Sequence, residues 1–146
     1  AKVLINRGEG SWPFTCCTIV LDQGGGPCLH KRVSGCCAVT EARAVTPCGE
    51  LFPCHQFVND PAYSMGDVWK GVTNTTMGEK FHRCNVVANP ACRDCWARLY
   101  CAGGCAANAY HASGDINGTY EYGCELFKKR IECAIMIKAA QAGRPR

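Results

Sequence analysis

Residues 92–105 read CRDCWARLYCAGGC, and their cysteines follow the spacing C-x2-C-x5-C-x3-C. Thiols this close in sequence form relaxed disulfides with one another poorly, but a looping backbone can bring them to a single metal. Gly103 and Gly104 favour such a loop because glycine adopts positive φ without a steric penalty. The metal ligands that this stretch predicts are Cys92, Cys95, Cys101 and Cys105.

The cysteine content of the whole chain indicates its broad class. Fourteen cysteines in 146 residues place the chain among small proteins that metals or disulfides stabilise. Cysteine-rich secreted chains are usually disulfide-bonded, whereas C-x2-C arrays in the cytosol usually hold metal. The first residues, AKVLIN, lack the long apolar segment and cleavage site of a signal peptide. We therefore expect a cytoplasmic, metal-binding protein.

Charge and hydropathy argue against two kinds of partner. The net charge of +4 is mild, and the basic residues form no stripe with interleaved aromatic residues, so we expect no nucleic-acid partner. The apolar runs are too short to cross a bilayer, so we expect no membrane partner.

Short strands are predicted in the first half of the chain. Residues 14–21 (FTCCTIVL) are apolar and β-branched, which predicts a buried strand in which Cys16 and Cys17 point to opposite faces and act as core residues. Residues 41–46 and 50–57 predict a β-hairpin around a Pro-Cys-Gly turn at residues 47–49. Cys54 would then lie near the end of the second strand, on a rigid element.

The second half of the chain predicts a loop and two helices. Residues 59–79 contain several glycines and an Asp-Pro pair, so we expect a loop anchored by Val68 and Trp69. An alanine-rich segment over residues 102–110 predicts a short helix. Residues 120–140 predict a long helix, because apolar residues recur at helical spacing. Cys124 would lie in its first turn, where the helix dipole favours a thiolate.

A longer cysteine pattern frames the central stretch. Cys36-x12-Gly49-x4-Cys54 precedes it, and Cys124 follows it. The whole pattern resembles the SPASM domain, the auxiliary-cluster domain of radical S-adenosylmethionine maturases of peptides and proteins. The segments GPCLHKR, AVTPCGELFPCHQF, MGDVWKG, CRDCWARLYCAGGCAANAY and GCELFKKRIECAIMIKAA are similar to the maturases of SCIFF (six-cysteines-in-forty-five) peptides, which form thioether crosslinks. The resemblance covers residues 27–140, with 1–26 as an N-terminal extension or linker and 141–146 as a tail.

The resemblance implies two [4Fe–4S] clusters. One cluster would be held by Cys92, Cys95, Cys101 and Cys124. The other would be held by Cys36, Cys54 and Cys105, with Cys28 as the candidate fourth ligand. Cys105 would thus cross to the neighbouring cluster, as the fourth cysteine does in two-cluster ferredoxins. If Cys28 does not ligate, one iron would be open to a thiolate of the cysteine-rich precursor peptide, which is the expected partner.

The catalytic part of the resembled enzymes is missing from the sequence. Their radical core binds S-adenosylmethionine through a C-x3-C-x2-C motif, and Asn108 stands where Cys101 and Cys105 would need a third cysteine. A partial TIM barrel also needs more residues than the chain offers. The chain is therefore expected to be an auxiliary module, a fragment or half of a split enzyme, with the core in cis or in trans. Its expected role is electron transfer, substrate positioning or both.

Two other classes fit the same cysteines. The first is a zinc-binding structural or interaction module, because tetrahedral thiolate sites do not by themselves distinguish zinc from iron–sulfur. The second is a secreted protein with fourteen cysteines in seven disulfides. In the favoured iron–sulfur interpretation the fold is a small, loop-rich, metal-stapled α+β domain with a β-hairpin, a cysteine-rich cluster loop and a long C-terminal helix.

Overall fold

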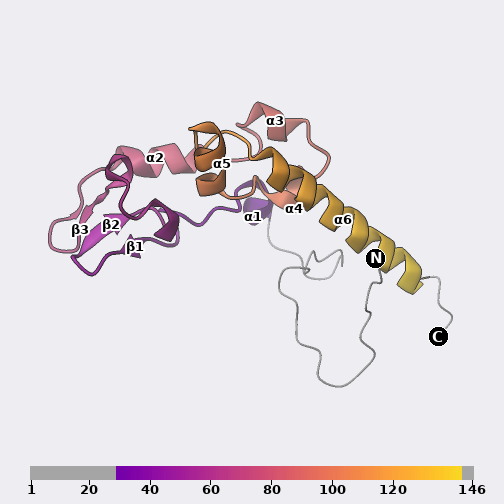
Figure 1. Ribbon diagram of the computed structural model, residues 1–146, viewed down its shortest axis with the longest axis horizontal. Coiled ribbons are helices and arrows are strands. Elements are labelled where there is room, and N and C mark those ends of the chain that lie inside the picture. Colours follow the sequence, from indigo (N-terminus) through magenta and orange to yellow (C-terminus); the bar gives the residue numbers. More distant parts are fainter. Residues whose placement is uncertain (1–28, 143–146) are drawn as a thin grey trace, which may run out of the picture.

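The protein is an α+β chain, as predicted. A computed structural model describes residues 29–142, and Cys16, Cys17 and Cys28 lie outside this range. The strands are β1 (Ala44–Val45), β2 (Glu50–Phe52), β3 (Gly66–Asp67) and β4 (Gly71–Val72). The helices are α1 (Leu29–Val33), η2 (His55–Phe57), η3 (Pro61–Tyr63), α2 (Thr76–His82), α3 (Pro90–Arg93), α4 (Arg98–Cys101), α5 (Ala106–Ser113) and α6 (Glu121–Ala142). The sheet lies at one end of the described chain and α6 extends from the other (Figure 1).

The four strands form one antiparallel sheet in the order β1-β2-β3-β4. The predicted hairpin is its first pair, with Ala44 opposite Phe52. Its turn is closed by Thr46, whose amide donates to the Glu50 carbonyl at 3.0 Å and whose hydroxyl accepts from the Glu50 amide at 3.0 Å. Gly49 completes the turn at φ +81°, a left-handed conformation that favours glycine.

The second strand is shorter than predicted. It ends at Phe52, because Pro53 has no amide to continue the ladder, and residues 55–57 form the 3₁₀-helix η2 instead. Cys54 is the residue that caps η2, with an extended backbone at φ −157°. The strand therefore does not present Cys54. The junction between the strand and η2 presents it.

Residues 59–79 are more ordered than the predicted loop. They contain η3, the hairpin β3–β4 and the first part of α2. The prediction that Val68 and Trp69 anchor this segment is wrong, since Val68 is 51% and Trp69 is 78% exposed. The segment is anchored instead by Met65 and Met77, which are 1% and 6% exposed.

An aromatic core joins the sheet to the helices. The ring of Phe57 stacks on Tyr63 at 4.2 Å between centroids and meets Phe81 of α2 edge-on at 5.6 Å. Tyr110 of α5 packs edge-on against Tyr63 at 4.9 Å, and its hydroxyl donates to the Asp60 carboxylate at 3.2 Å. These contacts fix α5, and with it the end of the cysteine-rich stretch, against η2, η3 and α2.

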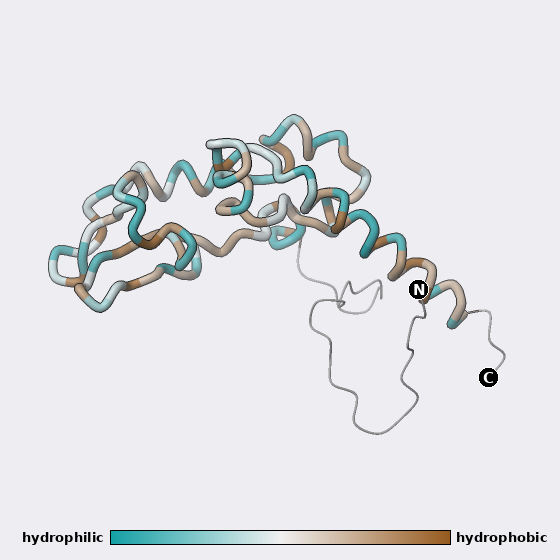
Figure 2. The backbone as a smooth tube through the Cα atoms, in the orientation of Figure 1, coloured by the Kyte–Doolittle hydropathy of each residue, from teal (hydrophilic) through white to brown (hydrophobic). Residues whose placement is uncertain are grey.

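The C-terminal helix was predicted closely, and α6 spans Glu121–Ala142. Its apolar stripe is covered only in part: Ile131 is fully buried, whereas Ile135 is 50% and Met136 is 54% exposed. Figure 2 shows brown, hydrophobic stretches along α6 where the helix extends away from the other described elements. None of the described helices combines the length and the hydropathy that a bilayer span requires.

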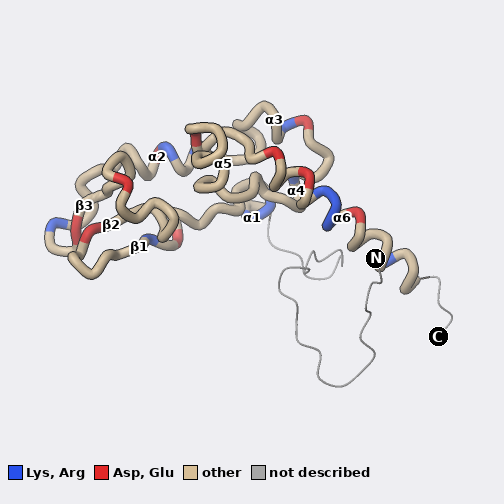
Figure 3. Tube along the Cα trace, viewed as in Figure 1, with Lys and Arg blue, Asp and Glu red and all other residues tan. Residues whose placement is uncertain are grey.

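Charged residues are scattered over the described chain. Figure 3 shows blue and red segments interspersed on the sheet, on α2 and on α6. On α6, Lys128 pairs with Glu125 at 2.8 Å and Lys129 pairs with Glu132 at 2.7 Å. Both pairs are exposed and three residues apart, so each contributes little to the stability of the helix.

Candidate metal centres

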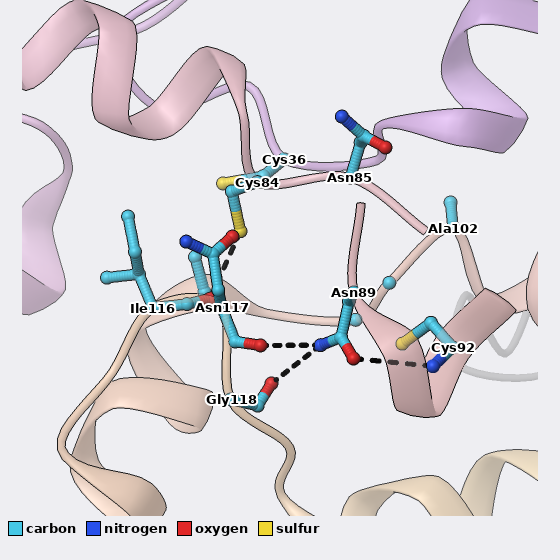
Figure 4. A pocket seen from close by; sticks show the side chains of 12 residues that line it. Cys36, Cys84, Asn85, Asn89, Cys92, Ala102, Ile116, Asn117 and Gly118 are labelled. Carbon is cyan, nitrogen blue, oxygen red and sulfur yellow. Dashed lines mark hydrogen bonds between the residues drawn. The ribbon is translucent and has the colours of Figure 1, made fainter. Parts of the chain in front are cut away.

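Asn89 organises the start of the cysteine-rich stretch. Its side-chain oxygen caps α3 by accepting from the amides of Ala91 at 2.9 Å and Cys92 at 3.3 Å. Its amide nitrogen donates to the carbonyls of Asn117 at 2.6 Å and Gly118 at 3.2 Å (Figure 4). One buried side chain thus joins the backbone of Cys92 to the loop that leads into α6 and Cys124.

The glycine loop has the geometry that the sequence predicts. Ala102, Gly103 and Gly104 all have positive φ, at 55°, 89° and 72°. A Cβ at Gly103 would lie 3.4 Å from Val86, and a Cβ at Gly35 would lie 2.8 Å from the Cβ of Ala102. The loop therefore packs closely against the segment that carries Cys36, and this approach brings the two cysteine regions together.

Four thiols lie within electrostatic reach of one another at one end of the stretch. Every pair of thiols among Cys92, Cys95, Cys101 and Cys124 interacts electrostatically. In each pair the charge of one thiolate raises the pKa of the other thiol. Burial raises the pKa of Cys101, and thiolates on Cys124, Cys92 and Cys95 raise it further. Charges that oppose one another in this way are what a cation placed among them would relieve.

Cys124 lies in the first turn of α6, as predicted. Its amide donates to the carbonyl of Tyr120 at 3.0 Å, so this amide is not free to support a thiolate. Burial raises the pKa of the Cys124 thiol, and nearby Lys128 lowers it without reversing the shift. In the metal-free chain, desolvation of the Cys124 thiol thus outweighs the favourable charge of Lys128, and the preference of the helix terminus for a thiolate stays a prediction.

Cys36 and Cys105 form part of a second group near the hairpin. The Cys105 thiolate raises the pKa of Cys36, whose main perturbation is burial. The nearby backbone amides of Ala38 and Ala106 lower that pKa. A tight turn follows Cys36, with Val39 buried at φ +67°, a strained conformation for a β-branched residue.

Cys54 and Cys28 are placed less directly. Cys54 packs against the same hydrophobic core as Cys36. It also begins η2, from which Gln56 reaches the Cys105 sulfur at 3.5 Å. Cys54 thus lies in the neighbourhood of the second group without a described contact between its thiol and the other two. Cys28 lies outside the described residues.

The sequence did not assign a role to Cys84. This cysteine follows α2, and its thiol donates to the Ile116 carbonyl at 3.1 Å. Burial raises the pKa of Cys84 to about 11, with further increases from nearby groups that include Cys36, Cys92 and Cys105. Cys84 also lines one cavity with Cys36 and Cys92 (Figure 4). No spacing rule marks Cys84, and only the packing reveals its position.

The free cysteines of the described chain are chemically suited to bind a metal as thiolates. All eleven cysteines within residues 29–142 are free, and seven of them are half-buried. Over the same residues, however, no three His, Cys, Asp or Glu side chains stand close enough to hold a metal ion. The cavity at Cys84 holds only about 20 Å³. The thiols are thus gathered into neighbourhoods, and metal loading requires them to rearrange, as is usual where binding is coupled to folding.

The chain matches no protein-family model, and no curated protein matches it significantly.

Proposed function

We propose that the chain is an auxiliary iron–sulfur domain of a radical S-adenosylmethionine maturase that forms thioethers in a cysteine-rich precursor peptide. The observation that carries the proposal is the mutual electrostatic influence of four thiols, Cys92, Cys95, Cys101 and Cys124. Cys124 lies on a different helix from the cysteine-rich stretch, yet it perturbs both Cys92 and Cys101. The similarity of the cysteine pattern to SPASM domains supports iron–sulfur clusters as the occupant.

Two groups of residues would hold the two [4Fe–4S] clusters. The first group is Cys92, Cys95, Cys101 and Cys124. The second group includes Cys36, Cys54 and Cys105, with Cys28 as the candidate that the resemblance offers for the fourth position. When bound, such clusters supply one-electron transfer and a site for a substrate thiolate.

The chain's own residues would tune and protect these centres. Gly103 packs near Val86, and Gly104 brings the backbone beside Cys101, where a Cβ would lie 3.9 Å from the sulfur. Gln56 donates to the Cys105 sulfur, and hydrogen bonds to ligand sulfurs shift the reduction potentials of iron–sulfur centres. Asn89 holds the segments that carry Cys92 and Cys124 at a fixed separation.

The radical step belongs to a core that would act with this chain in cis or in trans. The printed sequence contains no C-x3-C-x2-C motif, and S-adenosylmethionine would bind at that core. This domain would contribute electron transfer, peptide positioning or both, in the cytoplasm, where thiols stay reduced.

Loss of Cys124 tests the proposal. The full chain and its Cys124→Ala variant would be loaded anaerobically with iron and sulfide, with Cys133→Ala as the control because Cys133 is an exposed cysteine on the same helix. We expect Cys124→Ala to lose about half of the bound iron and of the visible charge-transfer absorption, and the control to lose none. Equal loading of all three proteins would contradict the proposal. Zinc uptake without sulfide would assign the chain to the structural zinc class.

A further inference from the structure

The helix α6 carries a second stripe of apolar side chains, on the side away from Ile131. Its members recur at alternating steps of four and three residues, and a single lysine interrupts them. The stripe consists of Tyr122, Leu126, Lys129, Cys133, Met136 and Ala140. Cys133 lies about 200° around the helix from Ile131. All six residues are exposed, so this side of α6 remains open where the Ile131 side is covered.

The spacing of the stripe is the one that pairs two helices. Steps of four and three residues make a heptad repeat, which keeps one seam of a helix facing a partner helix. Tyr122 is 68% and Leu126 is 50% exposed, so the stripe offers large apolar side chains for such a contact. Figure 1 shows α6 projecting from the rest of the described chain, which makes its outer turns accessible to a second helix.

The charges beside the stripe favour a second copy of α6 that runs in the same direction. In a parallel pair, a residue on one flank of the seam meets the residue five positions further along on the opposite flank of the partner helix. On α6 these two residues are Glu125 and Arg130, which carry opposite charges. In an antiparallel pair the flank with Glu125 and Glu132 would meet itself, and like charges repel.

We propose that α6 pairs in parallel and in register with the α6 of a second copy of this chain, through the stripe from Tyr122 to Ala140. Lys129 weakens the pair, because two ammonium groups approach one another between the helices. Glu132 holds each ammonium to one side at 2.7 Å. A single lysine in such a seam lowers stability while it restricts the register. The association is therefore weak and depends on protein concentration.

The pairing leaves the proposed metal ligand of α6 accessible to its own group of thiols. Cys124 lies seven residues before Ile131, and residues seven apart share one side of a helix. The stripe occupies the other side. Because the two helices are parallel, both Cys124 residues lie at the same end of the dimer. Pairing through α6 goes beyond the proposed function, and its tests are read without reference to the metal that these thiols bind.

Sedimentation of the full chain over a range of concentrations, under reducing conditions, tests the pairing. Met136→Lys places a charge in the stripe. Ile135→Lys is the matched control, because Ile135 is 50% and Met136 is 54% exposed but Ile135 lies off the stripe. We expect the mass of the parent to rise toward that of a dimer with concentration, and Met136→Lys to weaken association at least about tenfold. Ile135→Lys should match the parent. A parent that stays monomeric, or equal weakening in both variants, would overturn the inference.

A third variant keeps the test decisive if a lysine variant does not fold, as judged by its circular dichroism. Lys129→Leu makes the stripe apolar throughout and removes the repulsion between the two ammonium groups. We expect it to tighten association by about tenfold or more. Association that is unchanged or weaker in Lys129→Leu would overturn the inference.

A short bismaleimide crosslinker tests the orientation of the two helices. Each of its maleimides adds one thiol across a carbon–carbon double bond, so no oxidant is needed. A parallel pair in register brings the two Cys133 thiols together. We expect a covalent dimer in the parent and in Cys48→Ser, the control at another exposed cysteine, but not in Cys133→Ser. A covalent dimer that persists in Cys133→Ser, or that never forms in the parent, would overturn the parallel pairing.

Discussion

The side chain of Asn89 donates a hydrogen bond of 2.6 Å to the backbone carbonyl of Asn117. This bond connects two segments that each lead to predicted metal ligands, Cys92 on one side and Cys124 on the other. Asn89 is 9% exposed, so water competes weakly for its hydrogen bonds. The relationship explains how cysteines from the stretch and from α6 meet.

Replacement of Asn89 should therefore destabilise the fold and the proposed metal site together. Asn89→Ala removes an N-cap and leaves two carbonyls without their donor, and we expect a loss of about 2–4 kcal/mol in the free energy of unfolding. Asn85→Ala is the matched control, because the Asn85 oxygen caps only the local amides of Val87 and Ala88. Urea unfolding of the metal-loaded proteins measures the loss of free energy of unfolding in both variants. Equal losses in the two variants would show that the contact with Asn117 contributes nothing.

Two glycines allow the effect of backbone conformation to be separated from that of a contact. Gly49 and Gly71 have similar φ values of 81° and 77°, but a Cβ at Gly49 would lie 2.5 Å from the Trp69 ring, whereas a Cβ at Gly71 meets nothing within 4 Å. We expect either alanine variant to lose about 1–2 kcal/mol through its φ, since the exposed Trp69 ring can move aside. Only Gly49→Ala should change the tryptophan fluorescence. A shift of similar size in Gly71→Ala would contradict this packing.

The helix α6 should depend on its first half for stability. Ile131 is fully buried and Ile135 is 50% exposed on the same helix. We expect Ile131→Ala to lower the free energy of unfolding by about 2–5 kcal/mol, and Ile135→Ala to change it by less than about 1 kcal/mol. Thermal or urea unfolding checks both values. A large loss in Ile135→Ala would mean that the outer half of α6 is covered by another surface in solution.

The buried thiols predict opposite pH effects on stability and on metal binding. Burial raises the folded-state pKa of Cys84 from 9.0 to about 11, and it also raises those of Cys36 and Cys101. This contribution to the stability of the metal-free chain is complete below pH 9 and is lost as the pH rises toward 11. Metal affinity should instead increase with pH, since ligation requires thiolates. Urea unfolding of the metal-free chain between pH 9 and pH 11 tests the predicted fall in stability. Zinc titration over the same pH range tests the predicted rise in metal affinity. A free energy of unfolding that rises above pH 9 would contradict the burial of these thiols.

Local patterns in the sequence predicted the elements that depend on local interactions. The repeat of apolar residues around Ile131 predicts α6 to within two residues at each end, because a helix of 22 residues repeats its pattern many times. The hairpin is predicted by its turn at Gly49, because the residues of a turn are neighbours in the sequence. The spacing of Cys92, Cys95 and Cys101 is also a local pattern, so the sequence alone shows that these thiols can lie near one another.

The remaining features depend on tertiary packing. The strands β3 and β4 contain two residues each and include Gly66 and Gly71, so they have no periodicity to detect. Trp69 looks like a core residue by type, yet its ring covers the hairpin turn from outside. Cys84 and Cys36 line the same cavity because α2 docks against the core, and no sequence spacing encodes that proximity.

The metal content of anaerobically purified protein tests the central claim most directly. Iron, acid-labile sulfide and zinc would be measured on the same sample and expressed per chain. The account predicts about eight irons and about eight sulfides, which corresponds to two [4Fe–4S] clusters. Zinc without sulfide would contradict the iron–sulfur function, and the gathered thiols would then be structural zinc sites.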